Sequence, residues 1–382
     1  MPAPRRLLLF IVTGLDAVKL APLVLAARAH GSFDVHVCVC AGRQRAMLAS
    51  VLALFDIRPD FEMTPTRPGQ SPTGVTIDAL GGLAPVLAAV RPVWVVVQGG
   101  AASAFAAALG AFHAGVRVAH VEAGLRSGDS LQPCPDEMNR KLVGAIACLH
   151  FAPSAPAREN LLRQGVHPGR ILVTGNTGID ALYLVRERLR LDPACRAQAQ
   201  AALAQHGLQR FFSPERPFVL VSAHRRAPVG DSIDAMCFAV GELCARYPGV
   251  DVVFPLDSDA PAQCAVGTRL APLQIDNLIL CPALDYLPFV ALLLGAALVL
   301  TDSGAVQEEA HSLGAPVVDL RAASESGEGS AHLAGWHRSR IVAAAAGVLD
   351  AAALHRSGNK FYGDGHAARR ILAAFERYPD DA

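Results

Sequence analysis

Short hydrophobic segments recur along the chain, and each is followed by a turn and then by an alanine- and leucine-rich stretch with helical spacing. In the first half they are LLLFIVTG, FDVHVCVC, PVWVVVQGG, VRVAHVEAG, LHFAPS and RILVTGN; in the second half they are PFVLVSAHRR, VDVVFPLD, NLILCPALD, AALVLTDSG and APVVDLR. Their hydrophobic positions are mostly continuous, which is typical of strands buried on both faces of a parallel sheet. The alternation predicts a doubly wound α/β architecture, and its occurrence twice predicts two such domains.

The change between the two domains is predicted to follow the segment GNTGIDALYLV. For the domain bounds themselves we predict an N-terminal Rossmann-like domain over residues 1–178 and a C-terminal one over residues 179–360. Residues 186–216 are polar and rich in alanine and glutamine, and we expect a helix and a connection there. Residues 65–74, PTRPGQSPTG, are rich in proline and glycine and are predicted to form a loop.

Length and composition agree with two globular domains. The chain has 382 residues, of which 52% are hydrophobic, whereas single cores usually stop growing near ~250–300 residues. Lys+Arg and Asp+Glu both number 34, so the formal net charge is zero. This balance does not favour nucleic acid or an acidic membrane as a partner. Nine scattered cysteines without a CxxC pair indicate reduced thiols and a cytoplasmic protein.

The N-terminal segment has two arginines followed by hydrophobic residues, as a signal peptide has. Its hydrophobic run extends only from Leu7 to Val12 and ends in Thr-Gly without a small-residue cleavage site, which favours a buried first strand. Elsewhere we find no hydrophobic run that approaches the roughly 20 residues of a membrane span, so we expect no membrane-spanning helix.

Polar and glycine residues follow the predicted strands in both halves. The segments are TGLDAVK, QGG, VEAGLRSGD, TGNTGID, SAHRR, LDSD and TDSGAVQEE. Because doubly wound sheets bind ligands beyond the carboxyl ends of their strands, these segments predict a binding cleft between the two domains.

Residues 298–314, LVLTDSGAVQEEAHSLG, predict a strand, a tight turn and a helix. Ser303 suits the N-cap of that helix, and Gly304 lets a ligand approach the backbone closely. The amides and the dipole of a helix start favour an anion. Glu308 and Glu309, one turn further on, are placed where a carboxylate could accept hydrogen bonds from ribose hydroxyls. An ordinary capped helix with acidic residues is the alternative interpretation.

A basic segment follows another of the predicted strands. His224, Arg225 and Arg226 supply cationic or donor groups that suit a diphosphate, although a solvated basic turn would have the same composition. The segment TGLDAVK lacks both GxGxxG and the GKS/T ending of a phosphate loop, so it does not indicate a dinucleotide or ATP site.

The segment HVEAGLRSGDSLQPCPDEMNR, residues 120–140, concentrates charge in a chain that is only 18% charged. Glu122 follows a strand directly, Asp136 or Glu137 comes from the region beyond, and Arg140 is near. Two carboxylates on different elements suit general acid and base roles at a carbon acid. A salt-bridge network that supports a loop would use the same residues.

In combination, HVEAGLRSGD…PDEMNR, TGNTGIDAL, HRR, YLPFV, LTDSGAVQEEAHSLGAPVV and FYGDG resemble the motifs of the non-hydrolysing UDP-N-acetylglucosamine 2-epimerases, in order and spacing, over nearly the whole chain. The resemblance implies two Rossmann-like domains facing a cleft, as in the GT-B class of glycosyltransferases, with the last helix, residues 361–382, packed on the first domain. It implies interconversion of UDP-GlcNAc and UDP-ManNAc by elimination and re-addition of UDP, without a metal or other cofactor, in a cytoplasmic homodimer.

The resemblance also implies roles for individual residues. Glu122, Asp136 and His224 match catalytic positions, with aspartate at 136 where the family usually has glutamate. Positions that match contacts to the substrate are Lys19, Arg140, Arg225, Ser303, Gly304 and Glu309, the last of these to the ribose.

Several positions depart from the family pattern. Gly14 stands where the first loop has an arginine, Gly100 where a catalytic aspartate follows a strand, and Ala227 where a glutamate follows the two arginines. These losses act on the transition state, so we expect UDP still to bind while epimerisation is severely impaired or absent. The alternatives to an active epimerase are a UDP-sugar-binding relative without activity, for example a partner subunit, and a glycosyltransferase of the same architecture.

Overall fold

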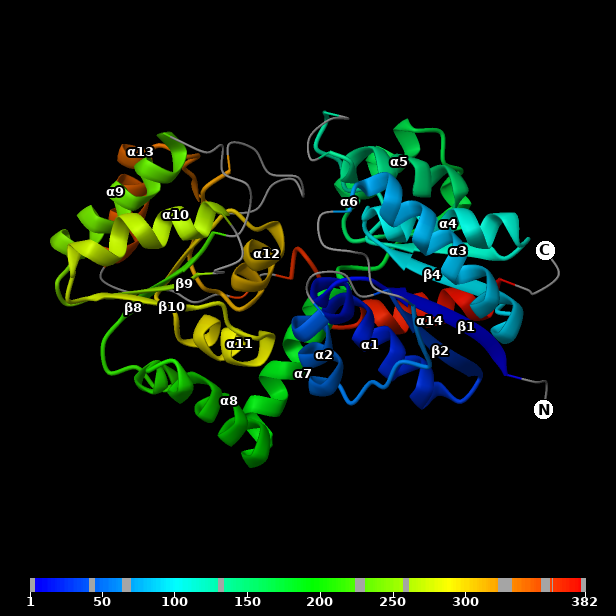
Figure 1. Cartoon of the computed structure of the whole chain (residues 1–382), viewed down its shortest axis with the longest axis horizontal. Coiled ribbons are helices and arrows are strands. Elements are labelled where there is room, and N and C mark those ends of the chain that lie inside the picture. Colours follow the sequence, from blue (N-terminus) through cyan, green and yellow to red (C-terminus); the bar gives the residue numbers. More distant parts are fainter. Residues whose placement is uncertain are drawn as a thin grey trace. The chain divides into compact units, whose positions relative to one another are not determined.

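The computed structural model describes residues 4–40, 45–63, 70–129, 134–223, 231–256, 261–321, 332–351, 358 and 360–378. The chain divides into two compact units, Met1–Tyr183 with Tyr362–Ala382, and Leu184–Phe361 (Figure 1). The boundaries expected from sequence, after residue 178 and before residue 361, lie a few residues from this division. As a statement about separately folding domains they stay a prediction, and so does the cleft between them.

The first unit contains a seven-stranded parallel sheet with the order β3-β2-β1-β4-β5-β6-β7. Its strands are β1 (Arg5–Ile11), β2 (Phe33–Val39), β3 (Phe61–Glu62), β4 (Trp94–Gln98), β5 (Arg117–Val121), β6 (Leu149–Ala152) and β7 (Ile171–Val173). Its helices are α1 (Gly14–His30), α2 (Arg45–Leu54), α3 (Pro72–Val90), α4 (Ala102–His113), α5 (Asp136–Ile146), α6 (Ala155–Arg163), the short η1 (Pro168–Arg170), the first part of α7 (Thr177–Leu191), and α14 (Ala367–Arg377).

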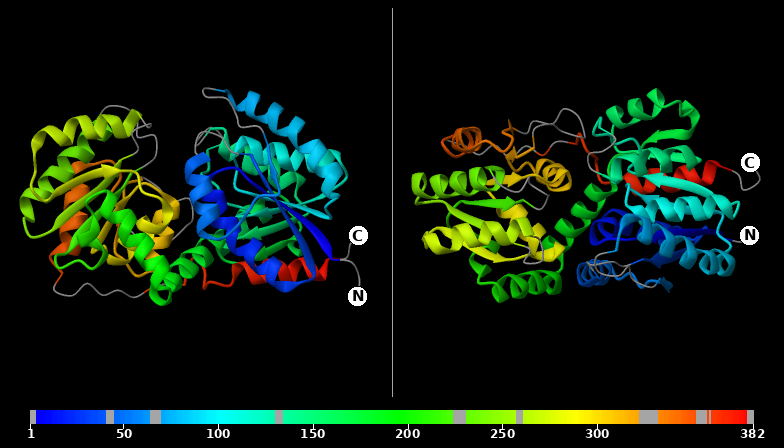
Figure 2. Two further views of the ribbon diagram at one scale, coloured as in Figure 1. Left: turned by 60° about the horizontal axis from the view of Figure 1, so that its bottom comes forward. Right: turned by 45° about the horizontal axis from the view of Figure 1, so that its top comes forward.

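The second unit contains a six-stranded parallel sheet with the order β10-β9-β8-β11-β12-β13. Its strands are β8 (Phe218–Ser222), β9 (Asp251–Leu256), β10 (Leu278–Pro282), β11 (Leu298–Thr301), β12 (Val317–Asp319) and β13 (His332–Leu333). Its helices are α8 (Pro193–Gln205), η2 (Gln209–Phe212), α9 (Asp231–Arg246), α10 (Pro261–Leu270), η3 (Ala271–Leu273), α11 (Tyr286–Gly295), α12 (Gly304–Ser312) and α13 (Arg338–Leu349). In each unit the chain starts mid-sheet and winds outward on both sides, which confirms the predicted pair of doubly wound sheets (Figure 2).

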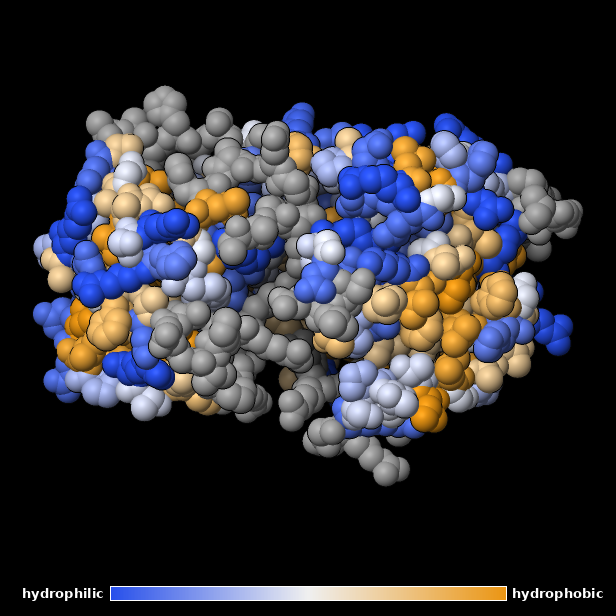
Figure 3. Space-filling model, turned by 90° about the horizontal axis from the view of Figure 1, so that it is seen from above, coloured by the Kyte–Doolittle hydropathy of each residue, from blue (hydrophilic) through white to orange (hydrophobic). Residues whose placement is uncertain are grey.

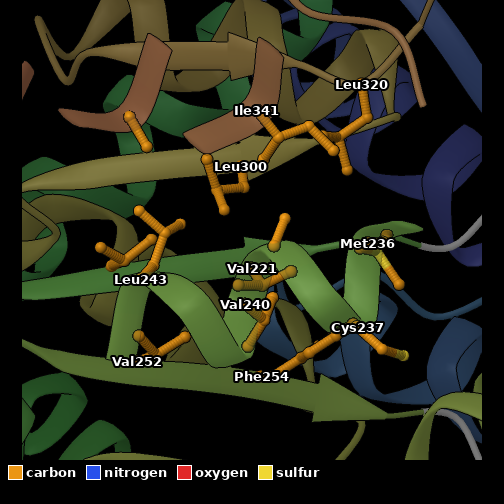
Figure 4. Packing of buried hydrophobic residues seen from close by; sticks show 14 of the residues in the cluster. Val221, Met236, Cys237, Val240, Leu243, Val252, Phe254, Leu300, Leu320 and Ile341 are labelled. Atoms are coloured by element: carbon orange, nitrogen blue, oxygen red, sulfur yellow. The ribbon is translucent and has the colours of Figure 1, made fainter. Parts of the chain in front are cut away.

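The strands are hydrophobic at nearly every position because both faces of each sheet are buried. The residues of β1 from Leu7 to Ile11 are each no more than 1% exposed. In the second unit, Val221 and Leu300 of the sheet pack with Val240 and Leu243 of α9 in one cluster, part of which is drawn in Figure 4. Each such side chain contributes about 1.5–3 kcal/mol when fully buried, so these clusters are the main source of stability in each unit.

The C-terminal helix α14 is part of the first unit. The carboxylate of Asp180, on α7, accepts hydrogen bonds from the backbone N–H groups of Ala367 and Ala368, at 3.1 and 2.8 Å. A carboxylate at a helix start is also favoured by the helix dipole. At the other end of the helix, Phe375 is fully buried, with its ring 5.4 Å from that of Trp94. In Figures 1 and 2, α14 is drawn in red among the blue and cyan elements of this unit.

Two polar segments contain helix starts, and one of them, residues 65–74, is predicted from sequence to be a loop. TGLDAVK is the start of α1: Thr13 Oγ1 accepts from the N–H of Asp16 at 3.1 Å, and Asp16 Oδ2 accepts from the N–H of Thr13 at 2.9 Å. This reciprocal capping box fixes the helix start. Helix α3 begins at Pro72, with Ser71 as its N-cap, so the end of the expected 65–74 loop is helical, while residues 64–69 lie outside the described part.

Helix α3 also corrects our expectation about hydrophobic runs. It has 19 residues and a mean hydropathy of 1.6, so by length and composition alone it could cross a membrane. Only 28% of its 18-residue window is buried in the described structure. Its buried residues include Leu83, Val86 and Leu87, whereas Ile77 is 64% exposed. The sequence concealed this run because glycine, proline and one aspartate interrupt it.

Candidate active site

Polar side chains of the first unit gather beyond the carboxyl ends of β1, β4 and β5. Glu122 follows β5 directly, Gln98 ends β4, and Lys19 lies on α1, which follows β1. Lys19 Nζ donates to Glu122 Oε1, and Gln98 Nε2 donates to Glu122 Oε2. The side chains of Lys19 and Glu122 are only 8% and 10% exposed. With a donor on each oxygen, the Glu122 carboxylate is held in one orientation.

The backbone at Glu122 is strained. Its φ of 62° lies in the left-handed region, which non-glycine residues rarely occupy. Such a residue costs on the order of 1–3 kcal/mol and persists only where the surroundings enforce it, often at functional sites. The surroundings here include Gly124, where a Cβ would collide with the carbonyl of Ala157, and the bond from the N–H of Ala123 to the carbonyl of Phe151 at 3.0 Å.

Asp16 adds a second carboxyl group near the pair of Lys19 and Glu122. It is 8% exposed, and burial raises its pKa to about 6, although hydrogen bonds from Thr13 and the charge of Lys19 act in the opposite direction. The capping box gives Asp16 a structural role. Its raised pKa means that its charge changes within the range of pH in which the protein would be assayed.

The first turn of α5 lies directly against Gly100, in the turn after β4. A Cβ at position 100 would lie 2.5 Å from the carbonyl oxygen of Asp136 and 2.7 Å from Cγ of Arg140. Asn139 Nδ2 donates to the carbonyl oxygen of Gly100 at 2.9 Å. Since the nearest obstruction is a backbone atom, position 100 cannot accept a side chain unless α5 moves.

A buried histidine pair supports the same turn from the sheet. His120 and His150 are partners in the register of β5 and β6, and they are 0% and 1% exposed. Burial lowers their pKa values to about 3 and about 4, so both rings are neutral near pH 7. His120 Nε2 lies 2.9 Å from the carbonyl oxygen of Gly99, and in a neutral ring this nitrogen must carry the proton to donate. His120 therefore restrains the turn that contains Gly100.

The structure distinguishes the two acidic residues at the start of α5. Glu137 is fully buried; its Oε2 accepts from the N–H of Ser127 at 3.2 Å and lies 3.5 Å from Nη1 of Arg140. These contacts tie the loop after Glu122 to α5, which is a structural role. Asp136 is only partly buried, so it is the better candidate for chemistry.

In the second unit, the start of α12 has the properties of an anion site. Ser303 occupies the N-cap position, but its side chain makes no capping hydrogen bond in the described structure, contrary to the expectation for that residue. Its N–H donates to Thr301 Oγ1 at 3.0 Å. A Cβ on Gly304 would lie 3.1 Å from Nη1 of Arg321, whose Nη2 pairs with Asp319 at 2.6 Å. A guanidinium group thus stands beside the amides of the helix start.

Glu309 lies within α12 and is 5% exposed, and its Oε1 accepts a hydrogen bond from the hydroxyl of Tyr286 at 2.8 Å. His224 and Arg225, the remaining residues assigned from sequence, lie outside the described residues. Within the ranges that the structure describes, no group of three or more His, Cys, Asp or Glu side chains is arranged to hold a metal ion.

Comparison with known proteins identifies the family. A family model described as UDP-N-acetylglucosamine 2-epimerase matches residues 25–376. The UDP-N-acetylglucosamine 2-epimerase of Yersinia pestis is 42% identical over 370 residues, covering 95% of this chain and 96% of the relative. The chain belongs to the UDP-N-acetylglucosamine 2-epimerase family. The predicted family is thereby confirmed.

Two solved structures of epimerases share the fold over almost the whole chain. The UDP-GlcNAc 2-epimerase of Neisseria meningitidis, bound to UDP-GlcNAc, matches with a TM-score of 0.90 at 31% identity, covering 98% of this chain and 100% of that one. The UDP-GlcNAc 2-epimerase of Methanocaldococcus jannaschii, in complex with UDP-GlcNAc and UDP, matches with a TM-score of 0.82 at 25% identity, covering 98% and 100%.

The two glycines that depart from the epimerase pattern differ in their surroundings. A Cβ at Gly14 would lie 2.8 Å from Cγ and 3.0 Å from Sδ of Met47, an unbranched side chain that is 38% exposed. At Gly100 the obstruction is a backbone carbonyl. The structure thus brings Lys19 to Glu122 and places the start of α5 beside Gly100, while the roles that the epimerase resemblance implies for these residues stay predictions.

Sequence reasoning missed three residues that contact the candidate site residues, Gln98 and Asn139 in the first unit and Tyr286 in the second. Gln98 could have been found, because it is the one polar residue of the strand sequence WVVVQ. Asn139 and Tyr286 lie in the quoted motifs PDEMNR and YLPFV, but nothing in the sequence says which partner each side chain reaches. Their partners, the carbonyl of Gly100 and the carboxylate of Glu309, are distant in sequence.

Proposed function

We propose that this chain binds UDP-N-acetylglucosamine and interconverts it with UDP-N-acetylmannosamine. The observation that carries the proposal is Glu122, which is held at the carboxyl end of β5 by Lys19 and Gln98 on a strained backbone. Support also comes from the family, since the N. meningitidis epimerase was solved bound to UDP-GlcNAc and the M. jannaschii epimerase with UDP-GlcNAc and UDP.

The reaction requires a proton to leave C2 of the sugar and another to return on the opposite face. In the forward direction a base removes the C2 proton, the C–H electron pair forms the C1–C2 double bond, and the C1–oxygen bond breaks to release UDP. In the return, C2 is protonated on the other face and the UDP oxygen re-adds to C1. We assign the two proton transfers to Glu122 and Asp136, since they lie on separate elements of the first unit.

Departure of UDP requires cations and donors at the diphosphate. In this proposal they are Ser303 and Gly304 at the start of α12, with Arg321 beside them, and Arg140 on α5. His224 and Arg225 complete the set by family resemblance. Charge-assisted hydrogen bonds contribute roughly 1.5–3 kcal/mol each, so the arginine missing at position 14 weakens UDP binding without abolishing it.

We expect catalysis to be slower than in epimerases with the full set of carboxylates. Gly100 offers no side chain, and the loss of one positioned acid or base costs about 10²–10⁴-fold in rate. The departures at Gly14 and Ala227 affect the departure of UDP. They should therefore lower the turnover further, and should lower the affinity for substrate less.

The deciding experiment is proton NMR of UDP-GlcNAc with the enzyme in deuterated water, at high enzyme concentration and over hours. We expect the C2 proton signal to disappear slowly with the wild type, as the proton exchanges for deuterium. With Glu122→Gln we expect no exchange, so the signal should persist. Glu159→Gln, an exposed position on α6 of the same unit, is the matched control and should exchange like the wild type. Exchange as fast as in active epimerases would show that another group replaces the missing aspartate.

Binding is measured separately by titration calorimetry with UDP. No heat and no thermal shift at millimolar UDP would contradict the proposal altogether. UDP binding without any C2 exchange would instead identify a UDP-sugar-binding relative without epimerase activity.

We further propose that the chain is a cytoplasmic homodimer that associates through the outer faces of α3 and α4. Ile77 on α3 is 64% exposed and Phe112 on α4 is 61% exposed, and hydrophobic surface gathers over the first unit, on the right of Figure 3. Such patches commonly mark interfaces. Light scattering should give a dimer for the wild type and for Leu273→Lys, an equally exposed leucine of the second unit, but a monomer for the double variant Ile77→Lys/Phe112→Lys.

A further inference from the structure

We propose that Tyr286 is a positioning residue that orients the Glu309 carboxylate, and that this pair sets the preference of the nucleotide site for ribose over 2'-deoxyribose. The inference rests on the proposed function, because it concerns UDP bound at the start of α12. It assigns a role to the tyrosine of the YLPFV motif.

The contact between the two side chains is direct and buried. Tyr286 is the first residue of α11, and its hydroxyl donates to Glu309 Oε1 of α12 at 2.8 Å. Tyr286 is 9% exposed and Glu309 is 5% exposed. A hydrogen bond to a buried carboxylate is costly to leave unmade, so this bond fixes the rotation of the carboxylate about its terminal torsion.

The tyrosine can act only as a constant donor. Burial, and after it the negative charge of Glu309, raises the pKa of Tyr286 well above its ordinary value. The phenol therefore keeps its proton near neutral pH. The hydrogen bond from Tyr286 that orients Glu309 is therefore present on both sides of neutral pH.

The position of Glu309 along α12 suits a nucleoside diphosphate. Glu309 lies five residues after Gly304, which is about 7.5 Å along the axis of a helix. Phosphates at the helix start would place the ribose hydroxyls at a comparable distance. A carboxylate has two oxygens and accepts from two adjacent hydroxyls, which 2'-deoxyribose cannot supply.

A purely structural role makes a different prediction. If the bond between Tyr286 and Glu309 only ties α11 to α12, its loss should lower stability and weaken every nucleotide equally. If Tyr286 positions Glu309, its loss should weaken a ribonucleotide selectively.

The test is titration calorimetry of the full chain with UDP and with 2'-deoxy-UDP. We expect the wild type to bind UDP about tenfold or more tightly than 2'-deoxy-UDP, as one charge-assisted hydrogen bond implies. In Tyr286→Phe this ratio should fall below about threefold, with most of the change in the affinity for UDP. Tyr247→Phe is the matched control: it removes another tyrosine hydroxyl, 2.8 Å from Asp350 Oδ1 in the same unit, and should leave the ratio unchanged.

A wild-type ratio in folded Tyr286→Phe would overturn the inference while leaving the proposed function intact. If that variant does not fold, Glu309→Gln takes its place, since its amide oxygen still accepts from Tyr286 but lacks the charge. An unchanged ratio in Glu309→Gln would likewise overturn the inference. A wild type that binds neither nucleotide would contradict the proposed function, and this inference with it.

Discussion

Adding a single methyl group at Gly100 tests how closely α5 is packed on the turn after β4. In Gly100→Ala the new Cβ would meet the carbonyl oxygen of Asp136 at 2.5 Å, well inside van der Waals contact. Gly100 has no positive φ, so backbone strain plays no part, and alanine would otherwise stabilise by about 0.4–1 kcal/mol through the unfolded chain. Overpacking typically costs about 1–3 kcal/mol, so we expect a net loss of up to roughly 2.6 kcal/mol.

Gly144→Ala, in α5 itself, is the matched control. A Cβ there would lie 3.6 Å from Nη2 of Arg126, an ordinary contact, and alanine inside a helix is favoured over glycine by up to about 1 kcal/mol. Urea unfolding followed by circular dichroism gives both values, fitted with a separate transition for each unit if two are resolved. Gly100→Ala as stable as Gly144→Ala would refute the close packing and the reasoning built on it.

The same packing decides what Gly100→Asp should do. From sequence alone this substitution restores a missing catalytic carboxylate. From the structure it displaces the first turn of α5, which carries Asp136 and Arg140. We therefore expect C2 exchange in Gly100→Asp to be no faster than in the wild type, and a clear rise would contradict this view.

Three further predictions concern the surroundings of the site. Lys19→Met removes the donor on Glu122 Oε1 and should lower C2 exchange by about 10²-fold or more in NMR, with UDP affinity changed less. Asp180→Ala removes the acceptor at the start of α14 and should cost about 0.5–2 kcal/mol in urea unfolding, with early loss of α14 in hydrogen exchange. Burial raises the pKa of Asp16 from 3.8 to about 6, so the folded state binds more protons than the unfolded state between these pH values. The free energy of unfolding should therefore fall as pH rises from about 4 to 6, by on the order of 3 kcal/mol. Asp16→Asn should remove this pH dependence, which thermal denaturation across the same range measures.

The strands were predictable because their environment is simple. A strand covered on both faces must be hydrophobic at every position, and Leu7–Ile11 shows this directly. Helix starts were harder. The pattern Thr13-Gly-Leu-Asp16 forms a capping box, but only the structure shows that the two side chains and backbone N–H groups bond reciprocally. Ser71-Pro72 is likewise a helix start that a loop-like composition concealed.

The site was predictable only in part because its residues come from several elements. Glu122 could be placed, since a strand end fixes it. Residue types alone left the choice between Asp136 and Glu137 open, and only the family resemblance favoured Asp136, because the choice depends on which of them bonds to the loop at Ser127. No periodicity in the sequence shows that α5 approaches Gly100 closely enough to exclude a side chain.

Gly14 and Gly100, which stand where the family has an arginine and an aspartate, therefore differ in whether the missing side chain could be restored by mutation. At Gly14 the space of a side chain is taken by Met47, which has several rotatable bonds and can withdraw toward solvent. At Gly100 the space is taken by the backbone of α5, which Asn139 holds to the same turn. A cation for the diphosphate could return by one substitution, whereas a third carboxylate requires α5 to move. If the proposed function holds, binding and proton transfer are therefore separable: we expect a side chain at position 14 to limit affinity for UDP and the position of α5 to limit turnover.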